Sequence, residues 1–425
     1  MIRIMKYGET STDEIFARKT NDMDVSGIVA DILADVRKEG DAALYRYTEK
    51  FDKVALNCLQ VSEEEINEAI ASQEPEFICV LEKAAANIRM FHSRQVRSNF
   101  VITGEDGIVM GQKITPVDRA GLYVPGGTAA YPSTVLMDSI PAKIAGVDEL
   151  VMVTPPGKDG KVNPAILAAA KVAGVDRIFK VGGAQAIAAL AYGTESIPKV
   201  DKIVGPGNAF VAEAKRQVFG LVSIDIIAGP SEILVVADGK SNPAWVAADL
   251  LSQAEHDRLS SAVLVTESYE LALGVQAEIE NLLSGMSRED IARTSIENNG
   301  KIIVADSIEA AITIANEIAP EHIELCVDNP FNWLNSIKHA GSIFMGRYCP
   351  EPLGDYFSGA NHTLPTGGTA KFSSPLSVDD FIKKSQFTYY TAEALNKVAD
   401  GVALFANKEG LTGHAKSMLI RKEQP

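Results

Sequence analysis

Apolar residues recur at helical spacing through most of the first 95 residues, in particular after Asp24-Val25-Ser26. The segment 62–65, Ser-Glu-Glu-Glu, has the form of a helix start, because acidic residues fill the turn that follows a serine cap. Two β-rich runs between residues 100 and 114 flank Glu105-Asp106-Gly107, a turn signal. The pattern therefore predicts N-terminal helices and a hairpin over residues 1–114.

From residue 121 the pattern changes to short apolar strands that alternate with helix-like segments. The first series has strands at 121–124, 149–153, 177–181 and 202–204 and helices at 132–145, 164–173, 184–191 and 208–219. A second series has strands at 224–237, 262–266, 301–304 and from 321, with helices at 243–257, 271–283 and up to 318. Such alternation is typical of parallel βαβ units. We therefore expect an α/β fold with domains over residues 115–230 and 231–377.

Residues 341–377 are crowded with glycine, proline, serine and threonine, and they present Asp355 and His362. A loop of this length in a compact protein is either functional or disordered, and its aromatic residues argue against disorder. Residues 378–425 are predicted as a helical C-terminal tail, with helices at 379–384, 392–407 and 412–420. This tail carries Glu409 and His414.

Length and charge narrow the class of protein. A chain of 425 residues is too long for one compact core, which agrees with several domains. The net charge of -16 argues against a nucleic-acid partner and against an anionic membrane surface. The start has no secretory signal, no apolar run has the length of a membrane span, and the four cysteines include no CxxC pair. We therefore expect a cytoplasmic protein without a disulfide framework.

Glu321 and His322 set a carboxylate directly beside an imidazole. Histidine is the side chain best suited to proton exchange near neutral pH, and a neighbouring glutamate can activate water. The alternation after His322 predicts a strand, and neighbours on a strand point to opposite faces. Both side chains can therefore serve one site only at the strand's entry, where Pro320 marks an irregular backbone. On this stretch alone, an ordinary strand start is the simpler interpretation.

Two glycine turns follow predicted strands, at residues 182–185 (GGAQ) and 205–208 (GPGN). Glycine allows a ligand to approach the backbone closely, and a helix N-terminus favours anions such as pyrophosphate. Neither turn matches GxGxxG, so the standard dinucleotide fingerprint is absent. A nucleotide site and ordinary tight βα turns both remain open.

The chain has six histidines, and four of them lie near acidic, amide or glycine-rich residues: His256, His322, His362 and His414. His256 shares a helix face with Asp249 and Gln253, because the spacing is i, i+4, i+7. Histidine and aspartate suit a divalent metal, with zinc the leading candidate. HExxH is absent and glutamine is an unusual zinc ligand, so four unrelated histidines remain an equal alternative.

Seven segments taken together resemble the histidinol dehydrogenase family. They are GLYVPGGTAAYPSTVLM, GGAQAIAALAYGT, KIVGPGNAFV, DIIAGPSEILVVAD, DLLSQAEHD, APEHIEL and GDYFSGANHTLPTGGTA. The resemblance runs through nearly the whole chain in the order of the family. It implies two incomplete Rossmann-like parallel-sheet domains, which fits the missing GxGxxG. It also implies a homodimer in which the tail reaches the partner's site and brings His414 and Glu409 there.

The resemblance implies zinc- and NAD-dependent oxidation of L-histidinol to L-histidine through L-histidinaldehyde, the last steps of histidine biosynthesis. Glu321 and His322 match the family's acid-base pair. The implied zinc ligands, for one ion per subunit, are Gln253, His256, Asp355 and His414. The implied substrate contacts are these four with Ser231, His322, His362 and Glu409, and the implied NAD contacts are Tyr123, Gln185 and Asn208.

Three other functions remain open at this point. A paralogue could oxidise another small alcohol, but such a protein would be expected to lose groups that grip the imidazole and amine of histidinol. A zinc hydrolase would use Glu321 as its base and no nucleotide. A non-catalytic metal-binding or scaffold protein would bind no small ligand. Reduction of NAD by histidinol would distinguish a histidinol dehydrogenase from all three of these functions.

Overall fold

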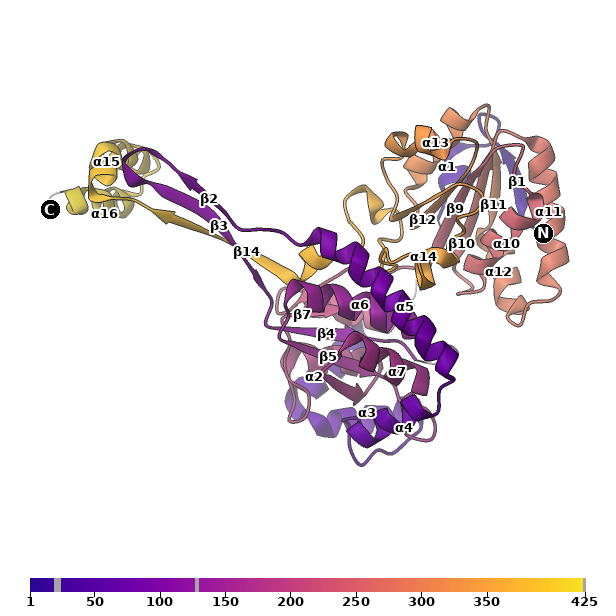
Figure 1. Ribbon diagram of the computed structural model, residues 1–425, viewed down its shortest axis with the longest axis horizontal. Helices are drawn as coiled ribbons and strands as arrows, with labels where there is room; N and C mark the ends of the chain where they lie inside the picture. Colours follow the sequence, from indigo (N-terminus) through magenta and orange to yellow (C-terminus); the bar gives the residue numbers. More distant parts are fainter. Residues whose placement is uncertain (19–23, 127–129, 423–425) are drawn as a thin grey trace. The chain divides into compact units, whose positions relative to one another are not determined.

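The computed structural model describes residues 1–18, 24–126 and 130–422. It forms two compact units, of which unit 1 comprises Met1–Gln95 with Asp118–Phe381, and unit 2 comprises Val96–Val117 with Ile382–Pro425. Unit 1 holds two parallel sheets with helices around them, and unit 2 holds an antiparallel sheet and the last helices of the chain (Figure 1). The sequence-based boundaries at residues 114, 230 and 377 stay a prediction. Within the described ranges, no helix has the length and apolar composition of a membrane span.

The first sheet of unit 1 has five parallel strands in the order β6-β5-β4-β7-β8. Its strands are β4 (Arg119–Tyr123), β5 (Glu149–Thr154), β6 (Arg177–Lys180), β7 (Lys202–Val204) and β8 (Ser223–Ile224). Its connecting helices are α6 (Pro132–Ala145), α7 (Pro164–Ala173), α8 (Gly183–Tyr192) and α9 (Ala209–Val218). Both α6 and α7 begin at a proline and end at a left-handed glycine, the pattern that starts and stops a helix. The predicted strand-helix alternation is confirmed.

Four N-terminal helices cover this first sheet. They are α2 (Ser26–Glu39), α3 (Asp41–Asp52), α4 (Glu63–Ala71) and α5 (Pro75–His92). The predicted start of α4 is confirmed, because Ser62 and Glu65 form a reciprocal capping box. Helix α2 packs on α8, α4 on α7, and α5 on α6. The buried core of this half therefore joins the N-terminal helices to the sheet.

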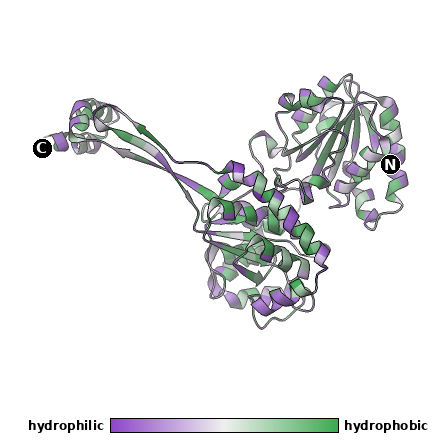
Figure 2. Ribbon diagram, viewed as in Figure 1, coloured by the Kyte–Doolittle hydropathy of each residue, from purple (hydrophilic) through white to green (hydrophobic). Residues whose placement is uncertain are grey.

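The second sheet of unit 1 has six parallel strands in the order β1-β11-β10-β9-β12-β13. Its strands are β1 (Arg3–Lys6), β9 (Glu232–Ala237), β10 (Ser261–Thr266), β11 (Lys301–Val304), β12 (His322–Cys326) and β13 (Ser342–Met345). Its helices are α1 (Thr12–Phe16), α10 (Pro243–Ala254), α11 (Tyr269–Leu283), α12 (Glu289–Asn299), α13 (Ile308–Ile318) and α14 (Pro352–Tyr356). Apolar cores lie on both faces of this sheet. Figure 2 shows hydrophobic residues concentrated in the strands of both sheets.

Strands β1 and β13 and helix α14 of unit 1 were not anticipated from the sequence. Strand β1 pairs with β11, almost 300 residues away in the chain, and its four residues are too few to show a period. The glycine- and proline-rich run at 341–377 contains β13 and α14, so it is not a continuous loop. The last glycine of the predicted turn after β4, Gly127, lies outside the described residues.

Unit 2 is built on the predicted hairpin. Strand β3 (Val109–Pro116) pairs antiparallel with β2 (Phe100–Thr103) on one side and with β14 (Ile382–Tyr389) on the other. The helix predicted at 379–384 is wrong, because a single 3-10 turn at Val378–Phe381 is followed by β14. Pairing with the distant β3 outweighs the weak local preference of this polar segment. Helices α15 (Ala392–Lys408) and α16 (Thr412–Lys422) complete the unit and confirm the last two predicted helices.

Candidate active site

Glu321 and His322 lie where the chain leaves α13 and enters β12. Ala319 ends the helix with a left-handed backbone (φ 49°), and Pro320 follows it. Both side chains contact the main chain of Glu232, the first residue of the neighbouring strand β9. The Glu232 N–H donates to Glu321 Oε2 at 2.8 Å, and the Glu232 carbonyl lies 2.9 Å from His322 Nδ1. The predicted strand entry therefore holds both side chains at one place.

This contact fixes the tautomer of His322. A carbonyl oxygen only accepts hydrogen bonds, so Nδ1 must carry the proton and Nε2 is left as an acceptor. Within the described chain Nε2 is buried and has no hydrogen-bond partner. Burial lowers the pKa of His322, so the imidazole is neutral near pH 7. A neutral imidazole with a free Nε2 is able to act as a general base.

Burial has the opposite effect on Glu321. The carboxyl is enclosed, and burial raises its pKa well above the usual value. The hydrogen bond from the Glu232 N–H opposes this shift. A carboxyl whose pKa is raised in this way can exchange protons with a neighbouring water at ordinary pH.

Helix α14 brings two further carboxyls to His322. Glu351 Oε1 lies 3.8 Å from His322 Nε2, and Asp355 contributes to the same cluster, whose ligand atoms lie within 4.8 Å of one another. Burial, reinforced by the charge of Asp355, raises the pKa of Glu351 to about 10. Sequence reasoning missed Glu351, because nothing in the local pattern around Cys349-Pro350 distinguishes it from a surface glutamate.

His362 pairs with Asp355. Their Nδ1 and Oδ1 atoms are 3.4 Å apart. Burial opposes ionisation of Asp355, but the hydrogen bond and charge of His362 outweigh it and lower the pKa of this carboxyl. Burial likewise disfavours the charged form of His362, and Asp355 outweighs it and raises the pKa of the imidazole. The two side chains therefore form a buried ion pair.

The segment around His362 is also bonded to α6, which belongs to the first-sheet half of unit 1. His362 Nε2 lies 3.4 Å from Thr134 Oγ1. Asn361 Nδ2 donates to the Met137 carbonyl at 2.7 Å, and Thr363 Oγ1 donates to Asp138 Oδ1 at 2.9 Å. Three consecutive residues of the second half, Asn361 to Thr363, thus each make one contact with a helix of the first.

Helix α10 supplies Gln253, and His256 lies in the turn after the helix, which ends at Ala254 and not at the predicted residue 257. The predicted helix face shared by Asp249, Gln253 and His256 is therefore wrong for His256, because the helix stops two residues before it. Asn242 caps the start of this helix and Pro243 opens it, as the sequence predicts. Gln253 is 1% exposed, and its Oε1 has no partner among the described residues. Burial lowers the pKa of His256, while the nearby charge of Asp355 opposes that shift. A buried amide oxygen without a donor suits the coordination of a cation.

The remaining predicted substrate and metal residues lie elsewhere. Ser231 directly precedes β9, is half-buried, and accepts a backbone bond from Ser261. Glu409 and His414 belong to unit 2, at the end of α15 and in the first turn of α16, and both are exposed. Their role in the site of unit 1 stays a prediction.

The three predicted NAD residues follow strands of the first sheet. Tyr123 ends β4, Gln185 lies in the first turn of α8 after β6, and Asn208 caps α9 after β7. In the sheet, β4 lies between β5, the next strand along the chain, and β7, a later strand. The strand order therefore changes direction at β4. Ligands of open α/β sheets bind at the carboxyl end of such a switch point. The sheet order therefore supports a nucleotide site at these residues.

At position 205, on this edge of the sheet, local contacts leave room only for glycine. A Cβ on Gly205, whose φ is +115°, would lie 2.1 Å from the Tyr123 carbonyl oxygen. Tyr123 Oη accepts the N–H of Gly183 at 3.1 Å, and burial raises the pKa of this phenol to about 12. Gln185 is buried, and its Oε1 has no partner within the described ranges. A free acceptor beside the glycine turn at Gly183 fits a bound ligand.

Comparison with known proteins identifies the family of this chain. The model of the family described as histidinol dehydrogenase matches residues 16–422. A histidinol dehydrogenase of Clostridium acetobutylicum is 55% identical over 426 residues, covering 99% of this chain and 99% of the relative. One of Listeria monocytogenes serovar 1/2a is 56% identical over 404 residues, covering 95% and 94%. The crystal structure of histidinol dehydrogenase from Elizabethkingia anophelis is 40% identical, with a TM-score of 0.94 and coverage of 99% of this chain and 98% of that one.

Proposed function

The chain belongs to the histidinol dehydrogenase family, and we propose that it oxidises L-histidinol to L-histidine through L-histidinaldehyde, with two NAD as acceptors. The observation that carries this proposal is the contact of Glu232 with both Glu321 and His322. It gives a neutral imidazole with a free Nε2 next to a carboxyl of raised pKa. Alcohol oxidation requires the first group, and addition of water to an aldehyde uses the second.

In the first oxidation, His322 Nε2 accepts the hydroxyl proton of histidinol, and it returns this proton to the aldehyde oxygen when water adds, so the imidazole is neutral again for the second oxidation. The carbinol carbon then gives a hydride to NAD, so two electrons and one proton leave as the C=O bond forms. Glu321 next takes a proton from water as its oxygen attacks the aldehyde carbon. In the second oxidation the resulting hydrate loses a proton to His322 and a hydride to a second NAD. A buried site retains the aldehyde between the two steps.

The zinc ligands in this proposal are Gln253, His256 and Asp355, with His414 of the tail. Zinc, when bound, would supply orientation of the substrate's imidazole and amine. The unpartnered Oε1 of Gln253 supports this assignment, because a buried amide oxygen without a donor suits a cation. Ser231, His362 and Glu409 would complete the substrate contacts.

NAD would lie at the carboxyl edge of the first sheet, against Tyr123, Gln185 and Asn208. The free Oε1 of Gln185 and the glycine turn at Gly205 support that place. The hydrogen bonds between α6 and the segment of His362 would hold His362, a proposed substrate contact, close to the first-sheet half of unit 1. The cytoplasmic location expected from the sequence stays a prediction.

The test is the ratio of NADH formed to L-histidinol consumed, measured on purified protein with and without a chelator. We expect two NADH per histidinol, loss of activity on chelation, and recovery on addition of zinc. One NADH per histidinol would instead describe an alcohol dehydrogenase that releases its aldehyde. No NADH from histidinol, with turnover of another small alcohol, would favour the paralogue.

We further propose a homodimer in which His414 and Glu409 act in the partner's site. Co-expressed His322→Gln and His414→Asn chains test this arrangement. Each separate variant should be inactive, whereas one of the two sites of a mixed dimer would be intact. Random pairing should then restore about a quarter of wild-type turnover. Activity no higher than that of the separate variants would contradict shared sites.

A further inference from the structure

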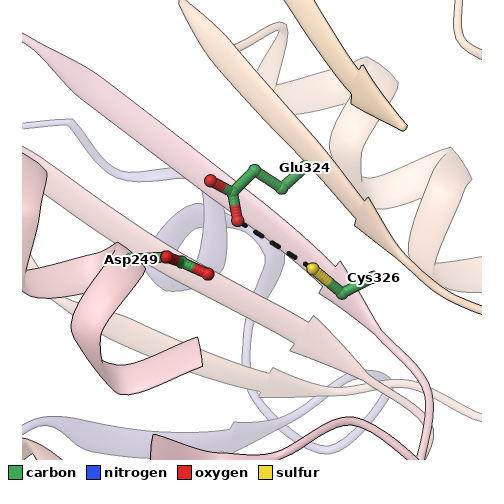
Figure 3. A group of neighbouring side chains, drawn as sticks. All are labelled: Asp249, Glu324 and Cys326. Carbon is green, nitrogen blue, oxygen red and sulfur yellow. Dashed lines mark hydrogen bonds between the residues drawn. The ribbon is translucent and has the colours of Figure 1, made fainter. Parts of the chain in front are cut away.

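Glu324 lies in the middle of β12 and is fully buried. Its carboxyl faces Asp249 of α10 and Cys326 of its own strand (Figure 3). Oε1 accepts the backbone N–H of Glu351 at 2.7 Å, and Oε2 lies 3.9 Å from Cys326 Sγ. A carboxyl oxygen of Glu324 lies within 4.8 Å of one of Asp249. One buried side chain thus touches α10 and the start of α14.

Each element that Glu324 joins holds residues of the candidate site. Its own strand begins at His322. Asp249 lies one helical turn before Gln253 on α10. On the other side, the Glu351 carbonyl accepts the N–H of Asp355 at 3.3 Å, so the bond from Glu324 fixes the first turn of α14. Glu324 therefore lies between the element that carries Gln253 and the one that carries Asp355.

Two buried carboxyls this close repel each other when both are ionised, so the pKa of at least one of them is raised. Burial raises the pKa of Glu324 well above the usual value, and burial raises that of Asp249 to about 6. Burial therefore favours the neutral form of Glu324, and its Oε1 accepts the N–H of Glu351.

We propose that Glu324 is a positioning residue, which bridges α10 to α14 and so sets the distance between the cation ligands Gln253 and Asp355. The inference deepens the proposed function and rests on it. Residues that hold metal ligands in place commonly change metal affinity or activity by about tenfold to a hundredfold when replaced. Glutamine offers the same donor and acceptor on a planar group of equal size, whereas methionine fills the space without either.

The experiment compares Glu324→Gln and Glu324→Met, each isolated as the zinc-loaded full chain. A chromogenic chelator reports the rate of zinc loss, and NADH formation reports kcat and the KM for histidinol and NAD. We expect the glutamine variant to stay within about twofold of wild type. The methionine variant should lose zinc at least about tenfold faster with a lowered kcat, while the KM for NAD stays unchanged.

Thr266→Val is the matched control. Thr266 is fully buried in the same sheet, and its hydroxyl accepts the N–H of Ser268, outside the site. This variant should lower thermal stability without faster zinc loss, which separates a positioning role from a general loss of stability. If Glu324→Met does not fold, Asp249→Leu removes the α10 side of the bridge at a half-buried position and should also speed zinc loss.

Three outcomes would overturn the inference. The methionine and leucine variants could keep zinc as wild type does. The glutamine variant could be impaired as strongly as methionine, which would implicate the charge of Glu324 rather than its hydrogen bonds. Wild-type protein that forms no NADH from histidinol and holds no zinc would overturn the proposed function, and the inference with it. In the first two cases the proposed function stands.

Discussion

Replacement of His322 by asparagine separates two properties of the imidazole. The asparagine amide nitrogen lies near the position of Nδ1, so it can keep the bond to the Glu232 carbonyl, which is 2.9 Å in the wild type. Asparagine has no atom near Nε2, so the proposed base is lost. Glutamine reaches toward Nε2 instead and leaves the Glu232 carbonyl without its donor. The pair of variants therefore tests the base and its support independently.

The expected magnitudes follow from these contacts. Loss of a positioned general base costs about a hundredfold to ten-thousandfold in rate, which is roughly 3–5 kcal/mol at the transition state. Both variants should show this loss in kcat. Only His322→Gln should also lose stability, by about 1–3 kcal/mol, because a buried carbonyl is left unsatisfied.

The pH dependence gives a second readout. Burial lowers the pKa of His322, so the base is present at neutral pH and is lost as the pH falls through that lowered value. The acidic limb of kcat/KM should therefore disappear in His322→Asn. NADH formation from histidinol would be followed from about pH 5 to about pH 9, with thermal unfolding of each variant.

His339→Asn is the control for this experiment. His339 lies in unit 1, and its N–H donates to Asn316 Oδ1 at 3.3 Å, outside the candidate site. It should leave both kcat and the acidic limb unchanged. If His322→Asn kept kcat within about tenfold of wild type, or kept the wild-type acidic limb, another group would be the base.

Three further predictions concern the first-sheet half of unit 1. Lys215→Met leaves the buried Asp225 carboxylate, which also accepts the N–H of Gly205, without its ion-pair partner. Denaturation should show a loss of stability of about 3–5 kcal/mol, which a second substitution, Asp225→Asn, should largely recover. Kinetic assays should show a raised KM for NAD. Burial raises the pKa of Asp138 to about 7, so its contribution to stability is complete below the unfolded pKa of about 4 and is lost as pH rises through about 7. The free energy of unfolding of Asp138→Asn, taken relative to that of wild type, should therefore be higher at pH 8 than at pH 4. The same difference at both pH values would contradict the raised pKa of Asp138. Phe179→Ala empties a fully buried site and should cost about 3–5 kcal/mol, measured by the same denaturation; a loss under about 1 kcal/mol would contradict tight packing there.

Local sequence was enough wherever a structure depends on neighbours in the chain. The capping box at Ser62, the prolines that open α6 and α10, and the strand-helix alternation are all visible in short windows. The entry of β12 at His322 is of the same kind, because Pro320 marks it. Resemblance of seven segments then gave the family, which the comparisons confirm.

Long-range pairing could not be read in this way. Strand β1 joins the second sheet through β11, and β14 forms where a helix was predicted, because strand partners far along the chain outweigh weak local preferences. The same applies to the support of the site. The main chain of Glu232, the carboxyl of Glu351 and the bridge at Glu324 carry no local signal.

The sequence by itself thus determined the element types, the α/β class and the candidate residues, since periodicity and motif order are properties of neighbouring positions. The tertiary structure decided the tautomer of His322 and the raised pKa of Glu324. Both depend on burial and on hydrogen bonds between residues that lie far apart in the chain. Those quantities exist only after the strands have paired.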